Sequence, residues 1–178
     1  MADALRGELG ANPIEAVLNR LGFWTLVFLL LALLPTALRL LTGWGEAIRY
    51  RRRIGLFAFV YACLHLATYV VLDHFFDFPA IVEDIVKRKF ITVGFAALVL
   101  MIPLALTSTD RAVRRLGYVR WQRWHRLIYG SAVLGVVHFV WRVKADHRVP
   151  SIFAAVLTLL LAIRALAVRR HRPGAAAS

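Results

Sequence analysis

Cysteine and acidic residues are scarce in this chain of 178 residues. The single cysteine, Cys63, lies inside an apolar stretch, which excludes an intramolecular disulfide and a cysteine-based zinc or iron–sulfur centre. We expect Cys63 to be a small buried apolar residue. The first twenty residues also lack the apolar core and cleavage site of a secretory signal peptide. Ten acidic residues against 23 basic ones leave a net charge of +13.

Apolar residues, in contrast, make up 60% of the chain and give it a mean hydropathy of +0.66. A soluble domain of this length is not normally so apolar. The apolar residues fall into five blocks, most of them about long enough to cross a hydrocarbon core of roughly 30 Å as a helix. The blocks cover residues 21–41, 54–72, 90–107, 125–141 and 151–168. We therefore predict one all-α membrane domain over residues 1–178, a bundle of five transmembrane helices.

Basic residues cluster in alternate segments between these blocks. Segments 42–53, 108–126 and 169–178 together hold 13 basic and two acidic residues, whereas the other three polar segments hold eight of each. The positive-inside rule then predicts a periplasmic N-terminus and a cytoplasmic C-terminus. The same distribution argues against a nucleic-acid partner and for contact with membrane lipid. Aromatic residues near the block ends resemble an interfacial belt: Trp44, Tyr50, Tyr118, Trp121, Trp124 and Trp141.

Three of the six histidines, His65, His125 and His138, lie in or at the edge of predicted spans. An ionisable side chain in a span is costly and normally faces the bundle interior, where an interhelical hydrogen bond is one use for it. His65 lies roughly 16 Å along its helix from Ile54, and His138 lies roughly 20 Å beyond His125. His65 and His138 thus reach similar depth on two helices, which suits axial ligation of one haem iron from both faces. Nothing in the pattern suits zinc.

His125 lies at the inner edge of its helix, at the depth of a second redox centre. On an ideal helix it is roughly 140° away from His138, so the two do not stack on one face. The pattern leaves open whether His125 binds the same haem as the other two histidines or a second one. Arg51 lies on nearly the same face as His65, at the inner edge. Its planar fork suits a haem propionate or a flavin phosphate, and an ordinary inside-positive charge explains it equally well.

The polar connectors hold fewer candidates for chemistry. We expect the remaining histidines, His74, His147 and His171, to be solvated surface residues. Residues 79–86 read PAIVEDIV, which predicts a short amphipathic helix lying on the membrane surface.

Several stretches of the chain together resemble the MsrQ (YedZ) family. They read RRRIGLFAFVYACLHLATY, KRKFITVGF, LTSTDRAVRRLGYVRWQRWHRLIY and VVHFVWRVK. The resemblance extends from GANPIEAVLNRLG to the fifth predicted helix, and it is the combination of motifs that is specific. By similarity, His65, His125 and His138 match the family's haem-linked histidines, and Arg51 matches a basic position at the start of the helix that carries His65.

The resemblance implies a haem-binding electron-transport subunit of the ferric-reductase-like transmembrane group in the bacterial inner membrane. Its cofactors would be haem b, as one or two groups, with FMN in addition. Electrons would come from a cytoplasmic flavin reductase, FMN or quinol. They would pass to MsrP, a periplasmic molybdenum enzyme that reduces methionine sulfoxide in oxidised envelope proteins. The chain itself would not be the sulfoxide-reducing enzyme.

The chain departs from the family at two points. Family members usually have six helices, and the helix before GANPIEAVLNRLG is missing, which we expect to reflect a shortened start or a five-helix variant. Lys89 stands where the family often has proline, a change that concerns the start of the third predicted helix and not the chemistry.

Two other classes of function are open. A ferric or metal reductase, or a superoxide-producing relative, would use the same haem bundle but needs a flavin and nicotinamide domain, here from a separate partner. A transporter or structural membrane protein needs polar residues along a path through the bundle, and these spans have few.

Overall fold

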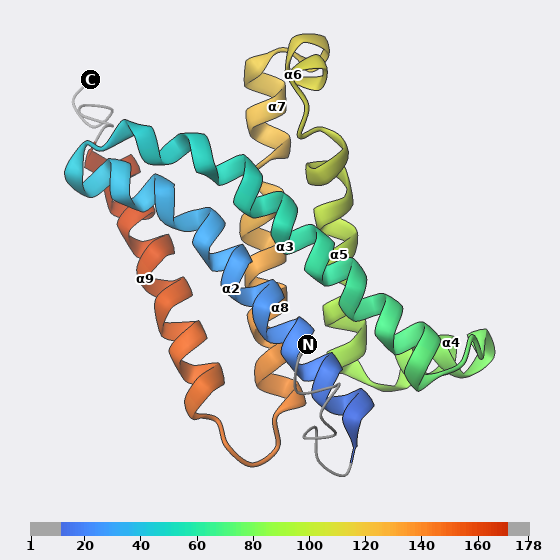
Figure 1. Ribbon diagram of the computed structural model, residues 1–178. Helices are drawn as coiled ribbons and strands as arrows, with labels where there is room; N and C mark the ends of the chain where they lie inside the picture. Colours follow the sequence, from blue (N-terminus) through green and yellow to red (C-terminus); the bar gives the residue numbers. More distant parts are fainter. Residues whose placement is uncertain (1–11, 171–178) are drawn as a thin grey trace, which may run out of the picture.

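The computed structural model describes residues 12–170, and every regular element within that range is a helix (Figure 1). In chain order these are α2 (Pro13–Thr42), the 3-10 turn η1 (Gly45–Ala47), α3 (Ile48–Thr68), the π-helical η2 (Tyr69–Asp73), α4 (Phe78–Lys87), α5 (Lys89–Leu106), α6 (Asp110–Leu116), α7 (Tyr118–Trp124), α8 (Leu127–Arg142) and α9 (Arg148–Arg170). The predicted all-α membrane bundle is confirmed.

Four segments in the described range are long and apolar enough to span a membrane: α2, the continuous stretch Gly45–Asp73, α5 and α9. The helix in the fourth predicted block, α8, has 16 residues, slightly fewer than a typical span. It nevertheless packs along α5 through the bundle, and Figure 1 shows the two running side by side. Helix α5 begins at Lys89, so this residue takes the first helical position, one that proline also favours.

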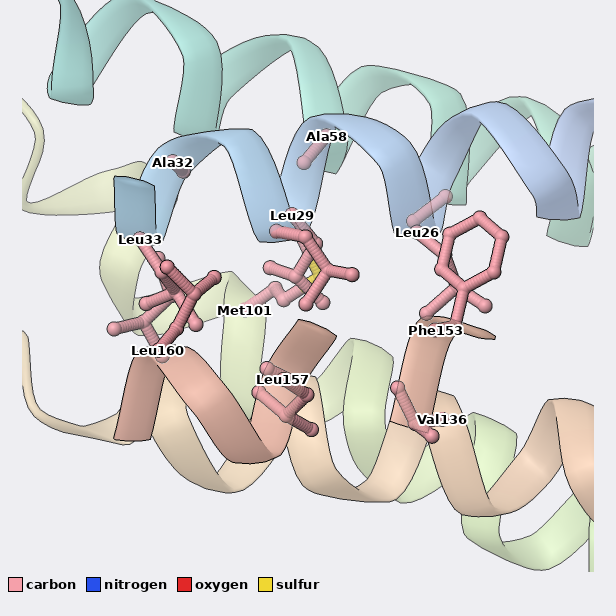
Figure 2. Close-up of a cluster of buried hydrophobic side chains, with 14 of the residues drawn as sticks. Leu26, Leu29, Ala32, Leu33, Ala58, Met101, Val136, Phe153, Leu157 and Leu160 are labelled. Atoms are coloured by element: carbon pink, nitrogen blue, oxygen red, sulfur yellow. The ribbon is translucent and has the colours of Figure 1, made fainter. Parts of the chain in front are cut away.

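Helix α2 is the central helix of the bundle. It packs along α3 and also contacts α8 and α9. Its most apolar stretch is 39% buried, against 11% for each of the other three candidate spans. Figure 2 shows Leu26, Leu29 and Leu33 of α2 meeting side chains from α5, α8 and α9. Ala32 of α2 and Ala58 of α3 are both fully buried, since small residues let two helices approach closely.

The two ends of the bundle differ in charge and in the elements they carry. At the end called here the basic end, the start of α3 and the start of α6 are joined by an ion pair between Arg52 and Asp110 at 2.6 Å. At the opposite end, called the α4 end, the start of α2 is joined to the end of α8 by an ion pair between Glu15 and Arg142 at 3.2 Å. The basic segments between the predicted spans therefore gather at one end, as the alternation of helices requires (Figure 1).

The short helix predicted in residues 79–86 is present as α4. Asp77 caps its start by accepting a hydrogen bond from the amide of Ala80 at 3.1 Å. Phe78, Val82 and Val86 recur at every fourth residue and are all exposed, so α4 presents an apolar stripe outside the bundle.

The expectation that Cys63 is buried is wrong, because its side chain is exposed. The buried face of α3 runs through Ala58 and Ala62. Position 63 is about 100° further round the helix and faces away from the core.

Candidate functional site

His65 of α3 and His138 of α8 lie face to edge within the bundle, although 73 positions separate them in the sequence. Their ring centroids are 6.3 Å apart and their ring planes are inclined by 82°. Both side chains are partly buried. The structure thus brings together the two histidines that the depth comparison singles out, and we call them the paired-histidine site.

The protein fixes the protonation of both rings in the paired-histidine site. Nδ1 of His65 lies 2.9 Å from the carbonyl oxygen of Leu18, and Nδ1 of His138 lies 2.7 Å from that of Phe90. A carbonyl oxygen only accepts hydrogen bonds, so Nδ1 must be the donor in each ring. In the neutral imidazole the lone pair is then on Nε2. Metal-ligating histidines usually donate their other ring N–H to such a carbonyl.

Two glycines provide the space that the rings occupy. A Cβ atom added to Gly94 of α5 would lie 2.6 Å from Nδ1 and 2.9 Å from Cε1 of His138. A Cβ atom added to Gly22 of α2 would lie 3.2 Å from Cε1 of His65. Each imidazole therefore rests against the backbone of a neighbouring helix, at a place where a larger residue would push it away.

These features suit a metal held by both imidazoles. The two rings are close enough to share one metal ion, because their centroids are 6.3 Å apart. Among the described residues, no group of three or more His, Cys, Asp or Glu side chains is placed to hold a metal ion. Two protein ligands alone suit haem iron, whose macrocycle supplies the other four.

His125 lies between α7 and α8 and has different partners, and we call it with Thr107 and Trp121 the His125 site. Its Nε2 lies 3.0 Å from Oγ1 of Thr107. The Trp121 ring covers the imidazole with a centroid distance of 4.0 Å and an inclination of 31°. Trp121 also donates a hydrogen bond from Nε1 to the carbonyl oxygen of Thr107 at 2.9 Å. Thr107 is thus held by both of the aromatic residues beside it.

The hydrogen bonds at Thr107 assign the proton on His125 to the opposite nitrogen. The Thr107 hydroxyl donates to the carbonyl oxygen of Pro103 at 2.6 Å. It therefore accepts from His125, which places the imidazole hydrogen on Nε2 and the lone pair on Nδ1. Burial, with the nearby charges of Arg51 and Arg52, lowers the pKa of His125 to about 4. The ring is thus neutral near pH 7 and has a lone pair for a ligand.

Arg51 is the fourth residue singled out by the sequence, and it lies at the basic end near His125 and not near the paired-histidine site. Its side chain is half-buried, whereas those of Arg52 and Arg53 are exposed. Arg51 is close enough for its charge to act on His125. A guanidinium beside a neutral imidazole suits an anionic group such as a carboxylate or phosphate.

The expectation that the connector histidines are solvated holds for His147, which is exposed, and is wrong for His74. The His74 side chain is only 17% exposed, with Nε2 3.4 Å from Asp84. Its ring packs on Tyr69, whose hydroxyl donates to Asp84 at 3.0 Å. The tight turn after η2 folds His74 back onto α4, which spacing alone does not reveal. His171 lies outside the described residues.

Sequence reasoning also overlooked residues that shape both sites. Trp121 differs from the other aromatic residues of the predicted interfacial belt, because its ring lies half-buried against His125, whereas the other five are exposed. Gly22 and Gly94 carried a usable signal, because an isolated glycine in a helix often marks close packing. Thr107 gave no such signal in the sequence, since threonine is common at the end of a span.

Comparisons with known proteins identify the family of the chain. A family model described as "Ferric reductase like transmembrane component" matches residues 21–136. The chain is 59% identical to the "Protein-methionine-sulfoxide reductase heme-binding subunit MsrQ" of Rhodospirillum rubrum, over 97% of this chain and 83% of that protein. Proteins of the same name from Herminiimonas arsenicoxydans and Azospira oryzae are 52% and 54% identical, over 90% and 88% of this chain and 74% and 68% of theirs.

The matched family region includes His65 and His125 and ends at residue 136, within α8 and two positions before His138. Identities of this size over most of both chains establish common descent and a common fold. The chain is a multi-pass membrane protein that belongs to the ferric-reductase-like transmembrane family and, within it, to the MsrQ haem-binding subunits.

Proposed function

We propose that the protein is a haem b electron-transfer subunit that carries electrons across the bacterial inner membrane to a periplasmic methionine sulfoxide reductase. The observation that supports this most strongly is the paired-histidine site. Both Nδ1 atoms are engaged by backbone carbonyls, which leaves both Nε2 lone pairs for iron. The relatives named as haem-binding subunits are the second line of support.

In such a protein, the side chains of this chain would bind and orient the haem groups. His65 and His138 would bind the iron of one haem group, and Gly22 and Gly94 would let their rings sit close to the backbone. Bound haem would supply the one-electron chemistry that amino-acid side chains lack. The surrounding apolar helices would exclude water, and the Leu18 and Phe90 carbonyls would keep the rings in the ligating tautomer.

The His125 site would form a second station at the basic end. His125 would provide a neutral imidazole, and Arg51 would pair with an acidic group of a second haem or with the phosphate of FMN. The basic end would face the cytoplasm by the positive-inside rule. Electrons from a cytoplasmic flavin reductase, FMN or quinol would then enter at His125 and leave at the paired-histidine site.

The partner would be a molybdenum enzyme of the MsrP type at the α4 end, which repairs oxidised methionine in periplasmic proteins. The relatives' names associate them with protein-methionine-sulfoxide reductase. A ferric or metal reductase with the same haem pair is the alternative, and it would need no such partner.

Electron transfer across vesicles tests the proposal. The purified protein is reconstituted into lipid vesicles that enclose ferricyanide, and reduced FMN, which does not cross lipid, is added outside. Wild-type protein is expected to consume the enclosed ferricyanide, and His65→Ala is expected to lower the rate to that of protein-free vesicles. His147→Ala is the matched control, because His147 is exposed and lies in neither site, and it should keep the wild-type rate. Equal rates for His65→Ala and wild type would contradict the proposal.

The partner is tested in the same vesicles. Enclosing a purified MsrP-type molybdoenzyme and methionine sulfoxide in place of ferricyanide should give sulfoxide reduction that depends on the membrane protein. Reduction of enclosed ferric chelates together with no sulfoxide reduction would favour the metal-reductase alternative.

A further inference from the structure

An ion pair lies at the α4 end beside the paired-histidine site. Nη2 of Arg142, in the last turn of α8, donates to Oε1 of Glu15, in the first turn of α2, at 3.2 Å. The Arg142 side chain is 29% exposed and that of Glu15 is 57% exposed. The pair therefore lies at the bundle surface, with its arginine turned partly inward.

Helix periodicity places this pair directly beyond the two imidazoles. Arg142 follows His138 by four residues, so both lie on the same face of α8. Glu15 precedes Leu18 by three residues, and the Leu18 carbonyl is the one that holds His65. The pair is thus about one helical turn from both rings. The charge of Arg142 acts on both of them.

Stability alone explains the pair only in part. An arginine in the last turn and a glutamate in the first turn of a helix each interact favourably with the helix dipole, but an exposed ion pair adds little to stability. Neither effect requires the pair to lie beside both histidines. A positive charge at that place has an additional consequence for any group that changes charge between the two rings.

We propose that Arg142 sets the reduction potential of the haem held by His65 and His138, with Glu15 as its counter-charge. The inference rests on the proposed function. Oxidation leaves one more positive charge between the imidazoles, and the guanidinium opposes that charge. Arg142 therefore favours the reduced state, and Glu15 partly offsets its effect. A low-dielectric bundle strengthens such an interaction compared with water.

The test is a redox titration of purified, haem-loaded variants followed by absorption spectroscopy. At a fixed potential, Arg142→Gln is expected to lower the reduced-to-oxidised ratio of the paired-histidine haem by about tenfold, which is 59 mV for a one-electron couple. Arg142→Lys keeps the charge and should retain most of the wild-type ratio. Glu15→Gln should change the ratio in the opposite direction. Lys144→Gln is the matched control, since Lys144 is an exposed cation two positions further on, and it should change the ratio less than about twofold.

The outcomes separate this inference from the proposed function. An Arg142→Gln protein with an unchanged haem spectrum and an unchanged potential would overturn the role of Arg142 and leave the haem site intact. Shifts of the same sign for Arg142→Gln and Glu15→Gln would also overturn it, because loosening of the helix ends would then be the cause. If Arg142→Gln does not fold, Glu15→Gln decides, and an unshifted potential in that variant contradicts the inference. A wild-type protein that binds no haem would instead overturn the proposed function.

Discussion

The paired-histidine site and the His125 site use the same side chain in opposite ways. At the paired-histidine site, backbone carbonyls accept the Nδ1 hydrogens, and the two rings come from different helices with their centroids 6.3 Å apart. At the His125 site, a threonine hydroxyl takes the Nε2 hydrogen, and a tryptophan covers the ring. One site is apolar and has two histidines, whereas the other has one histidine beside arginine charges.

This difference shows that the two sites differ in how far they are preorganised for a ligand. Backbone carbonyls of a helix cannot rotate, so the tautomer of His65 and His138 is fixed by the fold itself. A threonine hydroxyl can rotate, so the nitrogen that His125 offers can change. We therefore expect the paired-histidine site to be sensitive to small changes in backbone packing, and the His125 site to be sensitive to side-chain hydrogen bonds.

The largest effect is expected from Gly94→Ala. The new Cβ atom would lie 2.6 Å from Nδ1 of His138, so the ring must leave its place and lose its bond to the Phe90 carbonyl. Haem affinity at the paired-histidine site should fall by about 10- to 100-fold, the usual range when the support of a ligating histidine is lost. Titration of the purified apoprotein with haem, followed by absorption, measures this.

Alanine substitutions at two other glycines, where the new Cβ atom would be less crowded, provide the comparison for Gly94→Ala. Gly22→Ala should weaken haem binding less, because its Cβ atom would lie 3.2 Å from the nearest atom of His65. Gly130→Ala, whose Cβ atom would meet only the flexible end of Leu100 at 3.3 Å, is the matched control within α8. Equal affinities for Gly94→Ala and Gly130→Ala would show that the ring position does not matter.

A smaller effect, confined to the other site, is expected from Thr107→Val. Valine keeps the shape of threonine but cannot accept the Nε2 hydrogen of His125. If His125 binds iron through Nδ1, loss of this hydrogen bond makes the imidazole less basic, which favours the reduced state. The reduced-to-oxidised ratio of that haem should rise by about fivefold, the equivalent of one hydrogen bond, while the paired-histidine haem stays unchanged. A redox titration resolves the two, and a shift at the paired-histidine haem alone would contradict the assignment.

The smallest effect is a pH dependence that comes from His125. Burial and the charges of Arg51 and Arg52 lower the pKa of His125 to about 4 from an ordinary value of 6.5. Between these two pH values the unfolded chain binds a proton that the folded apoprotein does not. Stability from this residue is therefore full above pH 6.5, is lost as the pH falls towards 4, and stays constant below that.

Thermal unfolding of the apoprotein in detergent measures this dependence. Because His125 is half-exposed and solvent screens its interactions, we expect the midpoint to fall by only about 2–4 °C over this range. The fall should be absent in His125→Gln and present in His147→Gln. An identical pH profile for His125→Gln and wild type would contradict it.

Much of the architecture could be predicted from the sequence, because a membrane helix is recognised by the length and the hydropathy of its apolar stretch. The depth of His65 and His138 followed from helix rise alone, since both helices begin at the same end of the bundle. Helix α2 is longer than the predicted block 21–41, because its first two turns from Pro13 mix apolar with polar and charged residues and lie before the continuous apolar block. Rise and periodicity therefore predicted which histidines meet, but not where each helix starts.

The finer features of both sites could not be predicted in this way. Leu18 and Phe90 act through their carbonyl groups, which every residue has. Trp121 and His74 turn inward because of local turns between helices, and no periodic pattern describes those turns. The tautomer of His125 depends on the second hydrogen bond of Thr107, which only the three-dimensional arrangement reveals.

The most direct test is the absorption spectrum of the purified protein, oxidised and dithionite-reduced, beside His65→Ala, His138→Ala and His125→Ala. We predict a low-spin b-type haem signal that both His65→Ala and His138→Ala lose and that His125→Ala retains. Survival of the signal in both His65→Ala and His138→Ala would show that these two histidines do not hold one haem between them.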